Sequence, residues 1–153
     1  MSTLLDTNIL TRSAHPGDPM YQTAADAVDE LRREGELLYL VPQNFYEFWA
    51  VATRPKAQNG LGFTPVQARV ELTRVKGLFR VLNETPPVFA QWEQLVALHQ
   101  VKGKNAHDAH LVAAMLVHGV GRILTFNVAD FRRFPNITVL DPHQVVASRP
   151  PTP

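Results

Sequence analysis

The chain contains 153 residues, a length that suits one domain and leaves no room for a second of ordinary size. Hydrophobic residues make up 45% and charged residues 19%, so the composition is that of a globular rather than a disordered protein. The absence of cysteine from the sequence excludes disulfide scaffolds, thiolate metal sites and cysteine nucleophiles. A formal net charge of +1 argues against a strongly basic nucleic-acid coat protein, although a basic surface around an acidic site would give a similar total.

Short apolar segments alternate with longer amphipathic segments along the chain. Strands are predicted, in chain order, at residues 2–6, 37–41, 79–82, 122–125 and 137–140. Helices are predicted at residues 7–14, 20–34, 43–54, 64–76, 86–101 and 106–118. This alternation is typical of an α/β protein with a parallel sheet covered on both faces, in which ligands bind beyond the carboxyl ends of the strands.

Two parts of the chain are expected to lie outside these elements. Residues 55–63 contain the sequence Asn59-Gly60-Leu61-Gly62, which indicates either a mobile loop near a substrate or a plain surface loop. A single domain is expected over residues 1–146, followed by a loose proline-rich tail at residues 147–153. The opening segment lacks a signal peptide pattern and no apolar run is long enough to span a membrane, so we expect a cytoplasmic protein.

Two aspartates lie next to apolar segments, where a carboxylate is unusual. Asp6 closes the first apolar strand, where it could serve as the N-cap of the next helix or belong to a site at the strand end. Asp108 shares one side of its predicted helix with Leu111, Val112 and Met115, so it lies on an apolar stripe. A buried charge is costly unless it is paired or bound to metal, although a first-turn aspartate can also accept hydrogen bonds from backbone amides.

Glu47 is the third acid in an apolar setting. Ala50 and Val51 share its side of an aromatic-rich helix, and an ion pair with Arg54 is the structural alternative. Two like charges ~4 Å apart cost about 4 kcal/mol at an effective dielectric constant of about 20, so a cluster of these acids needs a cation or bound protons. Oxygen ligands favour Mg²⁺ or Mn²⁺, and such a site suits phosphodiester hydrolysis.

Three segments resemble the motifs of PIN-domain nucleases. They are Leu-Leu-Asp-Thr-Asn-Ile-Leu at residues 4–10, His-Asp-Ala-His-Leu-Val-Ala-Ala at 107–114, and Ile-Leu-Thr-Phe-Asn-Val-Ala-Asp-Phe at 123–131. Together with Glu47, the resemblance covers about residues 3 to 141. Within the family, a single short domain of this kind is most similar to the VapC-type toxins of bacterial toxin–antitoxin pairs.

The resemblance implies a PIN-like α/β/α sandwich with a central, mainly parallel sheet, and an endoribonuclease that depends on Mg²⁺ or Mn²⁺. Asp6 and Asp108 match the two metal-holding aspartates, and Glu47 matches the glutamate between them. All three are expected to hold the metal and to form the catalytic set. In the last motif Asn127 stands where aspartate is common and Asp130 follows three residues later, so the fourth position stays open between them. Other polar groups are expected to orient carboxylates or water: Thr7, Asn8 and Thr125.

The resemblance also implies three partners: an RNA substrate, an antitoxin protein that blocks the acidic cleft, and usually a second copy of the chain. A PIN-like module that binds RNA or protein without cutting is the alternative function, because the fourth acid is replaced. DNA is a third, weaker candidate for the substrate.

Other polar residues allow further alternatives. His107 and His110 flank Asp108 and raise a zinc hypothesis, but no third protein ligand has a useful spacing. Six basic residues near the motif ends are either phosphate contacts or scattered surface charges: Arg54, Lys56, Lys102, Lys104, Arg132 and Arg133. The sequence has no GxxxxGK[ST] motif, which excludes a P-loop NTPase, and Asn8 replaces the second aspartate of a haloacid-dehalogenase-type phosphatase.

Overall fold

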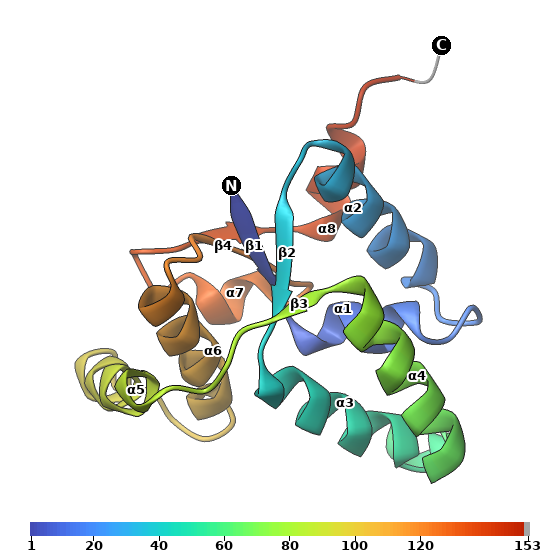
Figure 1. Cartoon of the computed structure of the whole chain (residues 1–153), viewed down its shortest axis with the longest axis horizontal. Helices are drawn as coiled ribbons and strands as arrows, with labels where there is room; N and C mark the ends of the chain where they lie inside the picture. Colours follow the sequence, from blue (N-terminus) through green and yellow to red (C-terminus); the bar gives the residue numbers. More distant parts are fainter. Residues whose placement is uncertain (152–153) are drawn as a thin grey trace.

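Five strands form one parallel sheet at the centre of the computed structural model, which describes residues 1–151 (Figure 1). The strands are β1 (Ser2–Leu5), β2 (Leu37–Leu40), β3 (Arg80–Val81), β4 (Arg122–Leu124) and β5 (Thr138–Leu140). They lie in the order β3-β2-β1-β4-β5, and each neighbouring pair is parallel. The first strand therefore lies in the middle of the sheet, with the later strands added on either side.

Helices cover both faces of this sheet. They are α1 (Thr7–Ser13), α2 (Tyr21–Arg33), α3 (Pro42–Thr53), α4 (Pro65–Leu78), α5 (Pro86–Leu98), α6 (Asn105–His118), α7 (Val128–Phe131) and α8 (Pro142–Ala147). Residues of α5, α6 and α7 pack into one hydrophobic cluster, and residues of α1, α2, α3, α4 and α8 pack into the other. The predicted α/β/α sandwich with a mainly parallel sheet is confirmed.

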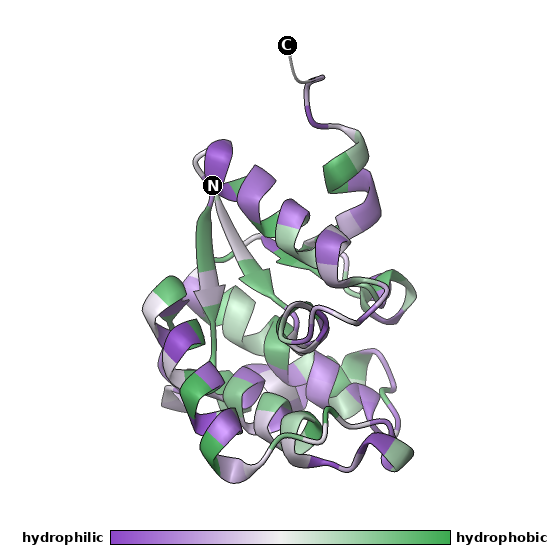
Figure 2. Cartoon of the chain, turned by 90° about the vertical axis from the view of Figure 1, so that its right-hand side faces the viewer, coloured by the Kyte–Doolittle hydropathy of each residue, from purple (hydrophilic) through white to green (hydrophobic). Residues whose placement is uncertain are grey.

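The two-sided core follows from alternation along the strands. Leu4 and Ile123 belong to the cluster beneath α5 and α6, whereas their neighbours Leu5 and Leu124 belong to the cluster beneath α1 to α4. All four side chains are fully buried. Because successive side chains of a strand point to opposite faces, continuous apolar runs are what a doubly covered sheet requires. Figure 2 shows the hydrophobic residues along the strands and the mixed hydropathy of the surrounding helices.

Several boundaries and two helices differ from the sequence prediction. The helix predicted at residues 86–101 ends at Leu98, and the segment 55–63 contains a 3₁₀ turn at Lys56–Gln58. The short helices α7 and α8 were not predicted. Their length is at most six residues, which is too short to show helical periodicity in the sequence.

The end of α8 bears on the predicted tail. Val145 and Val146 in α8 pack against the cluster beneath α1 to α4, and α8 includes Ala147. Residues 148–151 then continue without a helix or strand, and the last two residues of the predicted tail lie outside the described residues. Within residues 1–151, none of the helices has the length and apolar character needed to cross a bilayer.

Helix α3 offers a direct test of this packing, because it carries one buried and one exposed aromatic residue close together. Phe48 is 1% exposed and Tyr46 is 72% exposed. We expect Phe48→Ala to lower the free energy of unfolding by about 3–5 kcal/mol, since it opens a cavity in the core. Tyr46→Ala should change it by less than about 0.5 kcal/mol. Urea unfolding of both variants measures the difference, and equal destabilisation would contradict the assigned faces of α3.

Candidate functional site

The carboxyl ends of β1 and β4 bring the first two polar groups of the site together. The backbone amide of Asp6 donates to the carbonyl of Leu124 at 2.9 Å, which extends the β1–β4 ladder by one residue. Leu5 pairs with Leu124 in that ladder, so Asp6 and Thr125 leave the sheet side by side. Main-chain pairing thus positions the Asp6 carboxylate before any side-chain contact is made.

Side chains then fix the orientation of the Asp6 carboxylate. The hydroxyl of Thr125 donates to Oδ2 at 2.7 Å, and Nδ2 of Asn8 lies 3.3 Å from the same oxygen. The backbone amide of Thr7 donates to Oδ1 at 2.7 Å, so Asp6 is also the N-cap of α1. Asp6 therefore caps α1 and also lies at the end of β1, because the helix begins where the strand ends.

Glu47 reaches the same region from the first half of α3. Its Oε1 accepts a hydrogen bond from the hydroxyl of Thr7 at 3.0 Å and another from Nε2 of Gln43 at 3.0 Å. The alternative of an ion pair with Arg54 is wrong, because within residues 1–151 Glu47 instead bonds to these two neutral groups. Because both hydrogen-bond donors are neutral, neither compensates the negative charge of Glu47.

Asp108 lies in the first turn of α6. With the Asn105 amide turned to satisfy both of its neighbours, Nδ2 of Asn105 donates to Oδ2 of Asp108 at 3.3 Å and its oxygen accepts from Arg133 at 3.2 Å. The alternative for Asp108 is a first-turn aspartate that accepts hydrogen bonds from backbone amides. In the described part of the chain no backbone amide donates to its carboxylate, so its contacts do not support that alternative.

The acids line one pocket of about 250 Å³ at the carboxyl edge of the sheet. Its charged walls come from four elements or their ends: Asp6, Glu47, Asp108 and Asp130, with Lys104 as the neighbouring cation. Asn127 also lines the pocket, so both residues proposed for the fourth position are present. Thr7 and Asn8 belong to the lining, whereas Thr125 is fully buried behind Asp6.

Burial and mutual repulsion change the acid–base behaviour of two carboxyl groups. Burial, aided by the negative charges of Glu47 and Asp130, raises the pKa of Asp6 to about 6, although hydrogen bonds from Thr125 and Thr7 oppose the shift. Burial also raises the pKa of Asp108 to about 7, and the charges of Asp6, Asp130 and Glu47 add to it, with Lys104 acting in the opposite direction. The pocket thus favours protons or another cation over free carboxylates.

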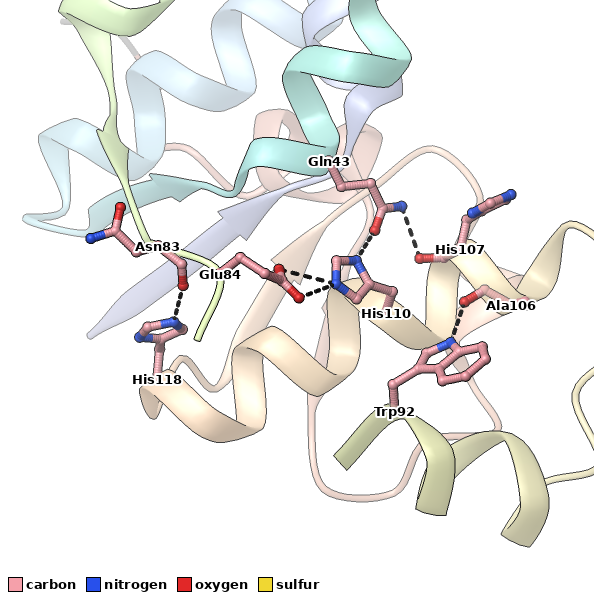
Figure 3. Close-up of polar contacts among 8 residues, drawn as sticks. All are labelled: Gln43, Asn83, Glu84, Trp92, Ala106, His107, His110 and His118. Carbon is pink, nitrogen blue, oxygen red and sulfur yellow. Dashed lines mark hydrogen bonds and ion pairs between the residues drawn. The ribbon is translucent and has the colours of Figure 1, made fainter. Parts of the chain in front are cut away.

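Gln43 is a site residue that sequence reasoning missed. Its Nε2 donates to Oε1 of Glu47 at 3.0 Å. The same nitrogen donates to the backbone carbonyl of His107 at 2.9 Å, which joins α3 to α6 (Figure 3). Its Oε1 faces Nδ1 of His110, whose Nε2 lies 2.9 Å from a carboxylate oxygen of Glu84. Both ring nitrogens of His110 are therefore engaged by oxygen atoms, which leaves neither free for the zinc alternative.

Asn44 is the second missed residue, and it is fully buried. Its Oδ1 accepts from the backbone amide of Val41 at 2.8 Å, and its Nδ2 donates to the carbonyl of Leu5 and the hydroxyl of Thr7 at 3.1 Å each. It therefore ties the ends of β1 and β2 together. The sequence did carry a signal for this, since two adjacent amides follow an apolar strand directly after Pro42.

The donor set at this pocket fits a hydrated divalent cation. Within residues 1–151, no three carboxylate or imidazole groups lie close enough together to be joint ligands of one ion. Mg²⁺ is commonly held by one or two carboxylates and keeps several water ligands, so a water-rich site between Asp6 and Asp108 suits it better than a closed cage. Burial is the main cause of the raised pKa of both groups and the neighbouring carboxylates add to it, and a bound cation would oppose both effects.

Comparison with known proteins places this geometry in a family. The PIN domain family model matches residues 3–137, which is most of the chain. The chain belongs to the PIN domain family. Asp6, Glu47, Asp108, Asn127 and Asp130 all lie inside the matched range of this PIN domain.

Individual relatives of this PIN domain agree in length and fold. Ribonuclease VapC48 of Mycobacterium tuberculosis is 26% identical over 144 residues, covering 93% of this chain and 98% of the relative. VapBC2 from Rickettsia felis, solved bound to a promoter DNA fragment, matches with a TM-score of 0.70 at 14% identity, over 92% of this chain and 98% of that chain. VapBC-1 from nontypeable Haemophilus influenzae also matches with a TM-score of 0.70, at 15% identity over 94% of this chain and 99% of that one. These two structures share the fold of the PIN domain described above.

The raised pKa values predict how stability depends on pH in metal-free protein. The folded chain binds protons at Asp6 and Asp108 more tightly than the unfolded chain, so its free energy of unfolding should fall between about pH 4 and pH 7. Asp108→Asn should flatten this decline, whereas Asp29→Asn, on the exposed side of α2, should not. Urea unfolding with EDTA across this pH range measures both slopes, and a decline that is equally steep in Asp108→Asn would contradict the assignment.

Proposed function

We propose that this protein is a divalent-metal-dependent endoribonuclease and the toxin of a type II toxin–antitoxin pair. The observation that carries the proposal is the pocket lined by four carboxylates, from four separate parts of the chain, and by a single lysine. Such an excess of charge is costly for folding and useful only if a cation is bound there. The matched family and a relative named as a ribonuclease support RNA as the substrate.

Asp6 and Asp108 are the residues proposed to hold Mg²⁺ or Mn²⁺, and Glu47, which lines the same pocket, would act on water bound to that ion. When bound, the ion would lower the pKa of a water and polarise the phosphorus–oxygen bonds of the substrate. Thr125 and Asn8 hold Oδ2 of Asp6 in place, so the carboxylate needs little reorganisation on binding. Lys104 is the pocket's own cation and is placed to contact a substrate phosphate.

Glu47 has one oxygen free for proton transfer. Thr7 and Gln43 both donate to Oε1, and in the described residues Oε2 accepts no hydrogen bond. The two donors hold the side chain in one rotamer and leave Oε2 able to accept a proton from an attacking water. Gln43 and Thr7 are therefore positioning residues in this proposal, acting through Glu47 rather than on the substrate.

The proposed role as a toxin that works with an antitoxin is based on similar proteins. Two of the similar structures are VapBC proteins, and their full-length match supports a protein that works with an antitoxin. An antitoxin that covers the acidic pocket would block cleavage by excluding the phosphate and the ion together. A homodimer and a cytoplasmic location, where RNA is available, complete the proposal.

The first prediction concerns the carboxylate at the end of β1. Asp6→Asn should reduce metal-dependent RNA cleavage by about 100-fold or more, because an amide is a weaker ligand and carries no charge. Asparagine still caps a helix, so the thermal stability of the variant should stay close to that of the parent protein or rise. Gel-based cleavage of a labelled RNA with Mn²⁺, compared with the same assay in EDTA, measures the effect.

The matched control for Asp6→Asn is Glu93→Gln, which removes an acid from the exposed side of α5, away from the pocket. It should leave cleavage within about twofold of the parent. Full activity of Asp6→Asn in a nuclease-free preparation would contradict the nuclease proposal. Tight RNA binding by the parent protein with no metal-dependent cutting would favour the alternative, a PIN-like binding module.

The fourth position can be assigned by a separate measurement of metal binding. We propose that Asp130 supplies the fourth carboxylate. It lines the pocket, and its negative charge contributes to the raised pKa of both Asp6 and Asp108. Asp130→Asn should weaken Mn²⁺ binding by about tenfold, and Asn127→Ala by about twofold or less. Isothermal titration with Mn²⁺ compares the two variants, and a larger loss in Asn127→Ala would reverse the assignment.

A further inference from the structure

A second, larger cavity of about 620 Å³ borders the acidic pocket. The two cavities share Asn8, Thr11, Val51 and Asn127 in their linings, so they open onto one another. The far walls of this groove come from the end of α1 with the turn after it, and from the loop at residues 56–61. We call this cavity the side groove.

The loop wall of the side groove is built into the fold. The amides of Leu61 and Phe63 donate to the carbonyls of Val51 and Ala52 in the last turns of α3, at 3.0 and 2.8 Å. Gly60 comes so close to Arg54 that an added Cβ would lie 1.9 Å from its carbonyl oxygen. The end of this largely exposed segment is thus tied through its backbone to the helix that carries Glu47.

The loop brings one available cation to the groove. Lys56 makes no ion pair within residues 1–151, and its side-chain carbons lie over Gly62, where an added Cβ would be 3.1 Å from Cγ. The other nearby cation, Arg12, is engaged by Asp18 at 3.1 Å. Lys56 therefore offers a positive charge beside a pocket whose own walls are acidic, an arrangement that suits a chain of phosphates crossing from one cavity to the other.

The remaining walls suit a nucleobase. Val51, Leu61 and Phe126 supply apolar surface, and Asn59 and Asn127 supply amide groups, whereas the amide of Asn8 is already bonded to Asp6 and Phe126. The volume falls within the range of about 300–1,000 Å³ that is usual for small-molecule sites. Apolar walls with a few amide groups recognise unstacked bases, whose hydrogen-bonding edges are free only in single-stranded RNA.

We propose that the side groove binds the nucleotide next to the phosphodiester held at the acidic pocket, with its base unpaired and Lys56 on its phosphate. The inference rests on the proposed ribonuclease function and adds to it a site for the neighbouring nucleotide, with Lys56 as the phosphate contact. A base kept in a duplex stays stacked on its neighbours and cannot enter the groove without the cost of being flipped out.

Binding is measured in an Asp6→Asn background with Mg²⁺, so that RNA stays intact. The probe is a fluorescein-labelled synthetic RNA of mixed sequence, used alone and annealed to its complement. Lys56→Gln should weaken binding of the unpaired RNA about fivefold and reduce the slope of log affinity against log salt by about 0.7. Lys56→Arg should restore both, and Lys76→Gln, on the exposed side of α4, should change affinity by less than about twofold.

In the otherwise unchanged protein, Lys56→Gln should raise KM for cleavage more than it lowers kcat, because it removes a contact made before and during the reaction. The annealed probe should bind at least about tenfold more weakly than the unpaired probe. Equal binding of both probes, or an unchanged affinity in Lys56→Gln, would overturn the proposal and leave the groove to a protein partner. If the parent protein does not cleave RNA but Lys56→Gln still weakens RNA binding, the nuclease function is rejected and the proposed role of the side groove in binding is supported.

Discussion

Uncompensated negative charge at the carboxyl edge of the sheet is the constraint around which this protein is organised. Asp6, Glu47, Asp108 and Asp130 line one pocket, and only Lys104 among the pocket's walls opposes them. Burial is the main cause of the raised pKa values of Asp6 and Asp108, and repulsion from the neighbouring carboxylates, which is stronger where water is excluded, adds to it. A fold selected for stability alone would place neutral residues there, so the arrangement points to a bound cation.

Neutral hydrogen-bond donors resolve the conflict between holding these acids and keeping them charged. Thr125 and Asn8 orient Asp6, while Thr7 and Gln43 orient Glu47, all without adding positive charge. An ion pair with arginine would have stabilised the carboxylates more directly, but it would also have neutralised the negative charge of the pocket. The polar network therefore orients the carboxylates but stabilises them less than an ion pair would. This is expected of a site that is preorganised for a ligand.

The helix α3 couples the two cavities on this edge. Its first turns carry Gln43 and Glu47 at the acidic pocket, and its last turns anchor the loop that holds Lys56 at the side groove. Phe48, the residue after Glu47, is buried in the core, so packing sets the orientation of α3. A substrate lying across both cavities would then meet acidic and basic walls at a fixed spacing.

The sequence by itself determined the strands, the longer helices and the three acids, because apolar alternation and misplaced charges are local patterns. It also placed Asp6 and Thr125 at strand ends, where parallel strands bring their carboxyl termini to one edge. Only the tertiary structure showed that Gln43 and Asn44 join β1, β2 and α6, since an amide has no periodicity and its partners lie far away in the chain. The same holds for the loop at residues 56–61. Its close approach to the end of α3, at Gly60 and Arg54, could not be predicted from its glycine and asparagine content.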